Sequence, residues 1–375
     1  MRFGLIFSLI IAIVAVLFAL QNPQTMDVNL LFFETRGSTA LVLMVTFALG
    51  IMVGLLSTLP KQLQARRKLK KLQRQIGSES KSSPGSSRPF AVLRRPPPLM
   101  PGAPIAVVAP ASAPRTAATY EQGLAQLTET YEVRRAWRPG SERGYLSAPD
   151  ADRVDALHRA IEDPDIRAIF CVRGGYGCLR LLHRIDWALA RQHPTLLVGY
   201  SDVTALHLAF YTKARWTGLS GPVVTEWAEA DPATLDSFQA WCRGTPSDLT
   251  GNFDAGLTPL ASGTVSGPLL GGNLSVLSRL IGTPFAHLEH AGVLDAVAGV
   301  ILGTFTTGEL DPDKPTLFLD DVFDDYLGTR SYPVVRGLPY GHHLPRCSLP
   351  MGAPVQLRAT AEETSLTAQS PVVDS

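Results

Sequence analysis

The sequence predicts an α/β protein preceded by a transmembrane helical hairpin. Two uncharged apolar runs, residues 3–20 and 40–59, lie near the amino terminus. From about residue 100 onward, short β-branched runs alternate with helical patterns, which is typical of α/β proteins. A serine- and proline-rich stretch separates the two parts. A chain of 375 residues also has room for more than one domain, since one domain usually takes ~100–200 residues.

The composition narrows the class of protein. With 45% hydrophobic and 18% charged residues, the chain can bury a core, which excludes global disorder. The formal net charge of +1 argues against a nucleic-acid-binding protein, so no nucleic-acid partner is expected. The 4 cysteines form no C-x-x-C motif, so we expect neither a disulfide scaffold nor a structural zinc site.

The two apolar runs have the length of membrane spans, ~18–20 residues each. The first has only Arg2 before it and no small-x-small cleavage site, which favours a retained span over a cleaved signal peptide. Basic residues cluster between Lys61 and Arg74, directly after the second run, and such clusters mark the cytoplasmic side. We therefore expect residues 1–60 to cross the inner (cytoplasmic) membrane twice, with both termini and the following head in the cytoplasm.

Residues 61–77 predict a basic juxtamembrane helix. Ala65, Leu69, Leu72 and Ile76 share one face of it. That face fits either a helix lying on anionic lipid head groups or a short coiled coil in a homodimer. Residues 78–99 are rich in serine and proline and predict a flexible linker.

The amino-terminal part resembles the lipopolysaccharide assembly protein A domain. The resemblance rests on the sequence Phe-Ala-Leu-Gln-Asn at 18–22, on Phe32-Phe33 in the short loop, and on Gly50 and Gly54 in the second span. It covers roughly the first fifth of the chain and implies a membrane hairpin with a lipid bilayer as partner.

The head is predicted to contain two α/β domains. In residues 100–226, the strand-like runs 105–109, 165–172 and 195–198 are each followed by turn residues and a helical pattern. This order predicts a parallel, doubly wound sheet with its site at the carboxyl ends of the strands. Strand-like runs recur in a smaller second domain, residues 264–375. The polar stretch 227–263 is interpreted as the connection between them.

A glycine-rich turn follows the second strand-like run, with the sequence Arg173-Gly174-Gly175-Tyr176-Gly177. Glycines there allow backbone N–H groups to face a ligand at a helix amino terminus. The sequence matches neither the phosphate-binding loop nor the dinucleotide-binding motif. From spacing alone, a tight structural turn explains it equally well.

A second turn, residues 199–204, places Ser201 between a strand and an amphipathic helix. A serine on such a turn can be a nucleophile. Alternatively, Ser201 caps the helix and Asp202 complements the helix dipole. The residues alone leave both roles open.

A serine nucleophile needs a base, usually histidine. His342 and His343 stand in a glycine- and proline-bounded loop that could hold one. His207 lies six residues after Ser201 on the same predicted helix and so points elsewhere. His287 and His290, with Glu289 between them, do not form a recognised metal-ligand set, so no metal is expected.

Taken in order, these motifs resemble the serine LD-carboxypeptidases, a family that includes the microcin C immunity peptidases. The matching segments run from about residue 101 to residue 372. They comprise residues 105–110, 144–146, 152–153, 168–177, 198–208, 267–275, 282–284, 297–303 and 337–342.

The resemblance implies a flavodoxin-like or amidotransferase-like α/β domain followed by a smaller α/β domain. It implies hydrolysis of an amide bond between an L- and a D-amino acid in muropeptides, without cofactor or metal. By motif match, Ser201 is the nucleophile and His342 the general base of a Ser–His–Glu triad. The backbone N–H of Asp202, with that of Gly174 or Gly175, would form the oxyanion hole.

One family element is missing from the sequence. The strand that bears the triad glutamate should stand between the Gly-Thr-Pro motif at 282–284 and the segment that starts near Val297, but the chain runs straight through. The triad glutamate is therefore not assignable. Three functions follow as alternatives: a membrane-tethered LD-carboxypeptidase, a catalytically impaired protein that binds a muropeptide or a partner, and an immunity-type peptidase acting on peptidyl-adenylate toxins.

Overall fold

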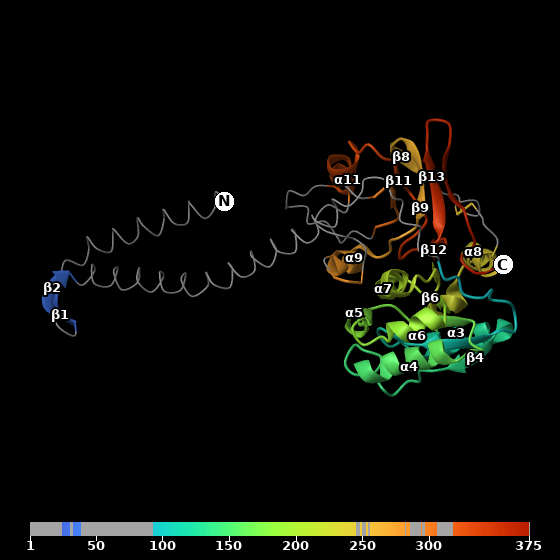
Figure 1. Cartoon of the computed structure of the whole chain (residues 1–375), viewed down its shortest axis with the longest axis horizontal. Coiled ribbons are helices and arrows are strands. Elements are labelled where there is room, and N and C mark those ends of the chain that lie inside the picture. The colour runs from blue at the N-terminus through green and yellow to red at the C-terminus, as the bar shows by residue number, and fades with distance from the viewer. Residues whose placement is uncertain are drawn as a thin grey trace. The chain divides into compact units, whose positions relative to one another are not determined.

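A six-stranded sheet organises residues 89–375, the larger of the two units of the computed structural model (Figure 1). The spatial order is β12-β7-β6-β5-β3-β4. The strands are β3 (Pro104–Val108), β4 (Glu132–Arg135), β5 (Ala168–Cys171), β6 (Leu196–Val198), β7 (Gly218–Ser220) and β12 (Leu349–Met351). All but β12 are parallel, and numbered along the chain they run 2-1-3-4-5, which is the flavodoxin-like order. The predicted parallel, doubly wound sheet is confirmed.

The structure describes residues 25–30, 33–38, 93–244, 248–249, 253, 256–281, 283–285, 294, 297–305 and 318–374. In the smaller unit, residues 1–88, β1 (Thr25–Leu30) and β2 (Phe33–Ser38) form an antiparallel pair in the loop between the two predicted spans. The predicted spans and the basic helix lie outside the described residues, as does most of the linker. None of the helices in the described ranges has the length and apolar character needed to cross a bilayer.

Helices cover both faces of the large sheet. Ile105 and Val107 of β3 pack in one cluster with α3 (Ala117–Thr130), η2 (Val224–Glu229) and α8 (Pro232–Cys242). Ala106 and Val108 pack in another with α4 (Asp150–Glu162), α5 (Cys178–Leu181), α6 (Trp187–Gln192) and α7 (Thr204–Ala214). Because successive strand residues point to opposite faces, a strand covered on both sides must be apolar throughout. The sequence Ile-Ala-Val-Val satisfies this requirement.

Two three-stranded sheets accompany the large one. One has the order β14-β13-β9, with β9 (Gly263–Pro268), β13 (Pro354–Ala359) and β14 (Thr364–Ala368). The other has the order β10-β11-β8, with β8 (Thr258–Ala261), β10 (Val300–Leu302) and β11 (Val334–Arg336). Helix α11 (Leu319–Leu327) packs on the second through Leu327. Figure 1 shows these strands at one end of the unit and α3, α4 and α6 at the other.

The segment from β11 to β12 carries the chain from a small sheet into the large one. It is fixed at both ends: Leu338 N–H donates to Leu302 O at 3.2 Å, and Trp241 Nε1 donates to Ser348 O at 3.1 Å. Residues 227–263, interpreted from the sequence as a connection, contribute helix α8 to the large sheet and strand β8 to a small one. The two parts of the head are therefore interleaved.

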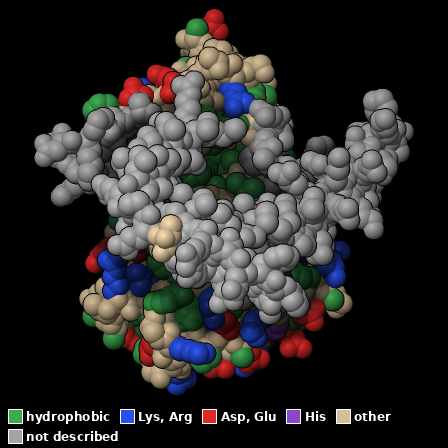
Figure 2. Space-filling model, turned by 90° about the vertical axis from the view of Figure 1, so that its left-hand side faces the viewer, with side chains coloured by type: hydrophobic (Ala, Val, Ile, Leu, Met, Phe, Trp, Pro, Cys, Tyr) green, Lys and Arg blue, Asp and Glu red, His purple; other side chains and the backbone are tan. Residues whose placement is uncertain are grey.

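On the coloured part of the face in Figure 2, Lys and Arg side chains lie close to Asp and Glu side chains. This distribution agrees with the near-zero net charge of the chain.

Candidate active site

Ser201 stands at the carboxyl end of β6, where the chain turns sharply into η1 (Ser201–Val203) and then α7. Its φ is +63°, which is uncommon for a residue other than glycine. This backbone conformation is typical of a nucleophile held on a strand-to-helix turn. Helix α7 begins at Thr204 without a side-chain cap, so the capping role considered for Ser201 is not seen.

Ser201 lies beside His342, although the two residues are far apart in the sequence. The distance from Ser201 Oγ to His342 Nε2 is 3.1 Å, within hydrogen-bond reach. His342 lies on the segment that links β11 to β12, so the crossing between two sheets brings it to the end of β6. A neutral imidazole with its proton on Nδ1 can accept the Ser201 proton at Nε2. The predicted pair is therefore brought together by the fold.

His207 has a structural role instead. It is buried in α7, and its Nε2 lies 2.8 Å from Gly199 O, two residues before the nucleophile. Burial lowers the pKa of His207 to about 4, so its side chain stays neutral. It supports the turn before Ser201 and, as its position on the helix predicted, it is not the partner of Ser201.

The glycine-rich turn packs directly on Ser201. A Cβ added to Gly174 would lie 2.8 Å from Ser201 Cβ and 3.2 Å from its Oγ, so only glycine fits there. Gly175 has a φ of +97°, and a Cβ on it would lie 2.4 Å from Ser112 Oγ. Within the described residues, the backbone N–H groups of Gly174 and Gly175 donate to no acceptor. Both remain available to an oxyanion formed near Ser201.

The loops at this edge are bound to one another. Asp202 Oδ2 accepts a hydrogen bond from Cys178 N–H at 2.8 Å, and burial raises the pKa of Asp202. Arg153 of α4 donates from Nη1 to Pro110 O after β3 and, at 3.1 Å, to Gly177 O after β5. Arg153 belongs to one of the segments that resemble the family, but the sequence did not predict its role in joining these loops. Its signal is a charge on a helix face otherwise made of buried apolar residues.

Three residues that sequence reasoning missed surround His342. Tyr200 OH donates to Glu226 Oε1 at 2.5 Å, and Arg346 Nη2 pairs with Glu226 Oε2. The Arg346 guanidinium lies 3.8 Å from the centre of the Tyr200 ring, whose other neighbour is the His342 ring at 5.4 Å. No local pattern could reveal this cluster, because its members come from the turn after β6, from η2 and from the segment just before β12.

The surroundings of His342 favour its neutral form. Partial burial and the nearby Arg346 guanidinium lower the pKa of His342, and His343 adds to this, while Glu226 acts in the opposite direction. A lowered pKa keeps Nε2 able to accept a proton at neutral pH. Solvent contact weakens each of these charge effects, because His342 is exposed on one side.

The acid of a triad is not seen at His342. Within the described ranges, no carboxylate forms a hydrogen bond with His342 Nδ1, and Glu226 instead binds Tyr200 and Arg346. Glu289, His287 and His290 lie outside the described residues.

The four cysteines are buried, and burial raises the pKa of each thiol, so none is an accessible nucleophile.

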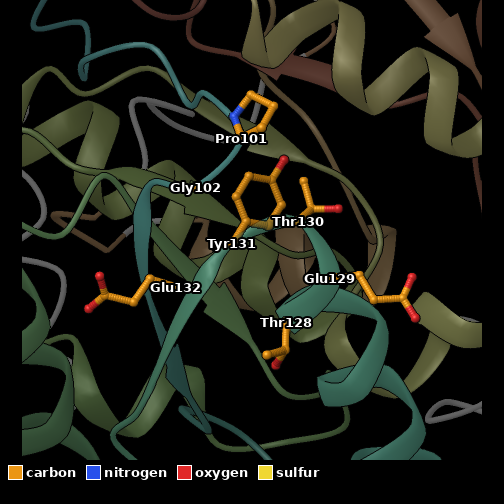
Figure 3. Close-up of a pocket in the computed structure, with 7 residues that line it drawn as sticks. All are labelled: Pro101, Gly102, Thr128, Glu129, Thr130, Tyr131 and Glu132. Carbon is orange, nitrogen blue, oxygen red and sulfur yellow. The ribbon is translucent and has the colours of Figure 1, made fainter.

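A surface pocket lies elsewhere, at the amino-terminal edge of the sheet (Figure 3). It is lined by residues 101–102 before β3 and by residues 128–132, which run from the last turn of α3 into the start of β4. Figure 3 shows the Glu129 and Glu132 carboxylates pointing away from one another. Ligands of open α/β sheets bind at the opposite, carboxyl edge, where Ser201 stands. The pocket is therefore not part of the candidate site.

Comparisons with known proteins agree with this arrangement. Residues 105–221 match the LD-carboxypeptidase N-terminal domain, residues 285–357 match the LD-carboxypeptidase C-terminal domain, and residues 21–82 match the lipopolysaccharide assembly protein A domain. A Streptomyces coelicolor relative, whose name assigns it to the carboxypeptidases, is 33% identical over 71% of this chain and 94% of its own. The probable murein peptide carboxypeptidase of Bacillus subtilis is 29% identical over 74% of this chain and 95% of its own.

Solved structures share the fold. The MccF-like protein from Bacillus anthracis aligns with a TM-score of 0.64 at 24% identity, over 75% of this chain and all (100%) of its own. The muramoyltetrapeptide carboxypeptidase from Oxalobacter formigenes aligns with a TM-score of 0.62 at 24% identity, over 72% of this chain and 100% of its own. At this level of identity the likeness establishes the α/β architecture.

Proposed function

The chain belongs to the LD-carboxypeptidase family, and from this premise we propose that its head is a serine peptidase that cleaves the amide bond between an L- and a D-amino acid in muropeptides. The observation that carries the proposal is the 3.1 Å approach of Ser201 Oγ to His342 Nε2 at the carboxyl edge of the sheet. The name of a relative in Pseudomonas aeruginosa, murein tetrapeptide carboxypeptidase, supports this substrate class.

The proposed reaction has two steps. Ser201 Oγ attacks the carbonyl carbon of the scissile amide while its proton moves to His342 Nε2. The oxygen of the tetrahedral intermediate accepts hydrogen bonds from the backbone N–H of Asp202 and of Gly174 or Gly175. His342 returns the proton to the leaving D-amino acid nitrogen. Water, deprotonated by His342, then attacks the acyl-enzyme ester and releases the shortened peptide and free Ser201.

A second function is favoured by one observation. Since no described carboxylate holds His342 Nδ1, the head could bind muropeptides without cleaving them efficiently. Mutation of the acid in a serine protease costs ~10⁴ in rate, while the oxyanion hole retains some catalysis. The two functions therefore predict rates that differ by orders of magnitude.

Incubation of the full-length protein, in detergent, with murein tetrapeptide tests the proposal. We expect D-alanine to be released, and Ser201→Ala to abolish the release. Tight peptide binding without D-alanine release supports the binding protein instead. Hydrolysis of a peptidyl adenylate, but not of the tetrapeptide, supports an immunity-type peptidase.

We further propose that residues 1–60 anchor the head to the inner membrane as a two-pass hairpin with the head in the cytoplasm. The apolar runs, the basic residues after them and the match to the lipopolysaccharide assembly protein A domain support this proposal. A reporter fused after Ser375 should be cytoplasmic, and one inserted near Asn29 should be exported. An exported carboxyl-terminal reporter would overturn the topology.

A further inference from the structure

Arg173, directly before the glycine that packs on Ser201, has a half-buried side chain and no carboxylate partner among the described residues. Arg173 follows β5 and donates from Nη1 to Ala113 O at 2.9 Å, across the gap between the loops after β3 and β5. This gap is the point at which the strand order reverses, where open α/β sheets bind ligands. Among the residues that the structure describes, Arg173 forms no ion pair, and its Nε and Nη2 donate to no acceptor.

A second cation adds to the positive charge at this point. Arg115 is exposed on the loop after β3 and likewise has no carboxylate partner within the described ranges. Burial and the like charge of Arg115 both lower the pKa of Arg173, against the weaker influence of Tyr200 and Glu226. The Glu226 carboxylate is already engaged by Tyr200 and Arg346. An anion from outside would therefore find uncompensated charge here.

The position fits one part of a peptide substrate. The scissile carbonyl must lie at Ser201 Oγ, against Gly174, which is the residue directly after Arg173. The carboxylate of a carboxyl-terminal residue is one residue beyond that carbonyl, and consecutive Cα atoms are about 3.8 Å apart. The side chain of Arg173 is long enough to span such a separation. Tyr176 of the same turn is 60% exposed.

We propose that Arg173, assisted by Arg115, binds the free carboxyl-terminal carboxylate of the substrate and so restricts cleavage to the last amide bond. Nε and Nη2 form the planar fork that matches a carboxylate, while Nη1 holds the loop. The inference rests on the proposed peptidase function and adds to it the recognition element that separates a carboxypeptidase from an endopeptidase.

The test compares two probes, murein tetrapeptide with a free carboxyl terminus and the same peptide as its carboxyl-terminal amide. Full-length protein should cleave the free acid about 10- to 100-fold faster, in kcat/KM, than the amide, since a hydrogen bond to a charged group contributes ~1.5–3 kcal/mol. Arg173→Met should lower kcat/KM for the free acid by a similar factor and leave the amide almost unchanged. Arg173→Lys should restore part of the difference.

Arg191 provides the matched control, because its Nη1 also donates to a backbone carbonyl, Lys213 O at 3.3 Å, away from Ser201. Arg191→Met should keep the full preference for the free acid, and Arg115→Met should reduce it in part. An Arg173→Met protein that is folded and still prefers the free acid to the same extent would overturn the inference.

Calorimetric binding to the Ser201→Ala protein separates this inference from the proposed reaction. If the wild-type protein releases no D-alanine, tighter binding of the free acid than of the amide, lost in Ser201→Ala/Arg173→Met, still supports the carboxylate site. Equal binding of the two peptides, or binding of neither, overturns the inference. Hydrolysis of both peptides at equal rates would retain the peptidase and reject only the role of Arg173.

Discussion

Replacing Gly174 by alanine should disable the site without disturbing the fold. Gly174 does not adopt a positive φ, so its backbone suits alanine, but the new Cβ would lie 2.8 Å from Ser201 Cβ. Ordinary carbon contacts are ~3.5–4.0 Å, so the two loops must separate by roughly 1 Å. A misplacement of ~1 Å can cost ~10²-fold in rate. We therefore expect kcat/KM of Gly174→Ala to fall about 10²-fold, or ~2.7 kcal/mol of transition-state stabilisation.

The assay is D-alanine release from murein tetrapeptide, with thermal unfolding of the same sample measured in parallel. Gly267→Ala in β9 is the control, because a Cβ there meets nothing within 4 Å, and it should keep wild-type activity. A folded Gly174→Ala protein with wild-type kcat/KM would show that the turn does not pack on Ser201 as described. It would also remove the main argument for an oxyanion hole at this turn.

Other variants test His342 and its neighbours. Ser201→Ala and His342→Ala should each lose nearly all D-alanine release, and the double variant should lose little more, because residues that act as a unit are not additive. Loss of activity in His343→Ala but not in His342→Ala would show that His343, and not His342, is the base. Since the pKa of His342 is lowered and only the neutral imidazole accepts a proton, the acid limb of the kcat/KM profile should lie below the pH of ~6.5 at which an ordinary histidine titrates. Glu226→Gln, which removes the charge that favours the imidazolium, should move this limb to lower pH, and Arg346→Met should move it to higher pH; identical limbs in all three proteins, followed by imidazole NMR as well as by activity, would contradict the coupling.

The sequence predicted the large sheet because its strands carry their own evidence. Ile105 to Val108 and Ala168 to Cys171 are continuous apolar runs, as a strand buried on both faces requires. Helix α8 also has a local sequence signal, since Asp231 caps it and Pro232 occupies its first turn. Because the surrounding sequence is polar, this segment is interpreted from the sequence as a connection and not as a helix.

Strand β12 and the His342 neighbourhood could not be predicted in the same way. The strand is three residues long with Pro350 in its middle, a composition that fits only an edge strand, and its partner β7 is distant in the sequence. The residues of the Tyr200–Glu226–Arg346 cluster are likewise far apart in the sequence, and only the packing of the folded chain brings them into contact. Recognition of the family supplied the Ser201–His342 pair, and the fold then showed how the two side chains meet.

The crossing from β11 to β12 has a consequence for biosynthesis. Amino-terminal segments fold first as a chain is synthesised. A nascent chain that has emerged as far as β7 already holds the serine turn, but it holds neither the histidine nor the strand that covers the edge of β7. On the ribosome the unfinished protein therefore has a nucleophile without a base, and an open sheet edge that can pair with other chains. The Ser201–His342 pair and the protection of that edge therefore form together, when the segment with His342 and strand β12 completes the fold.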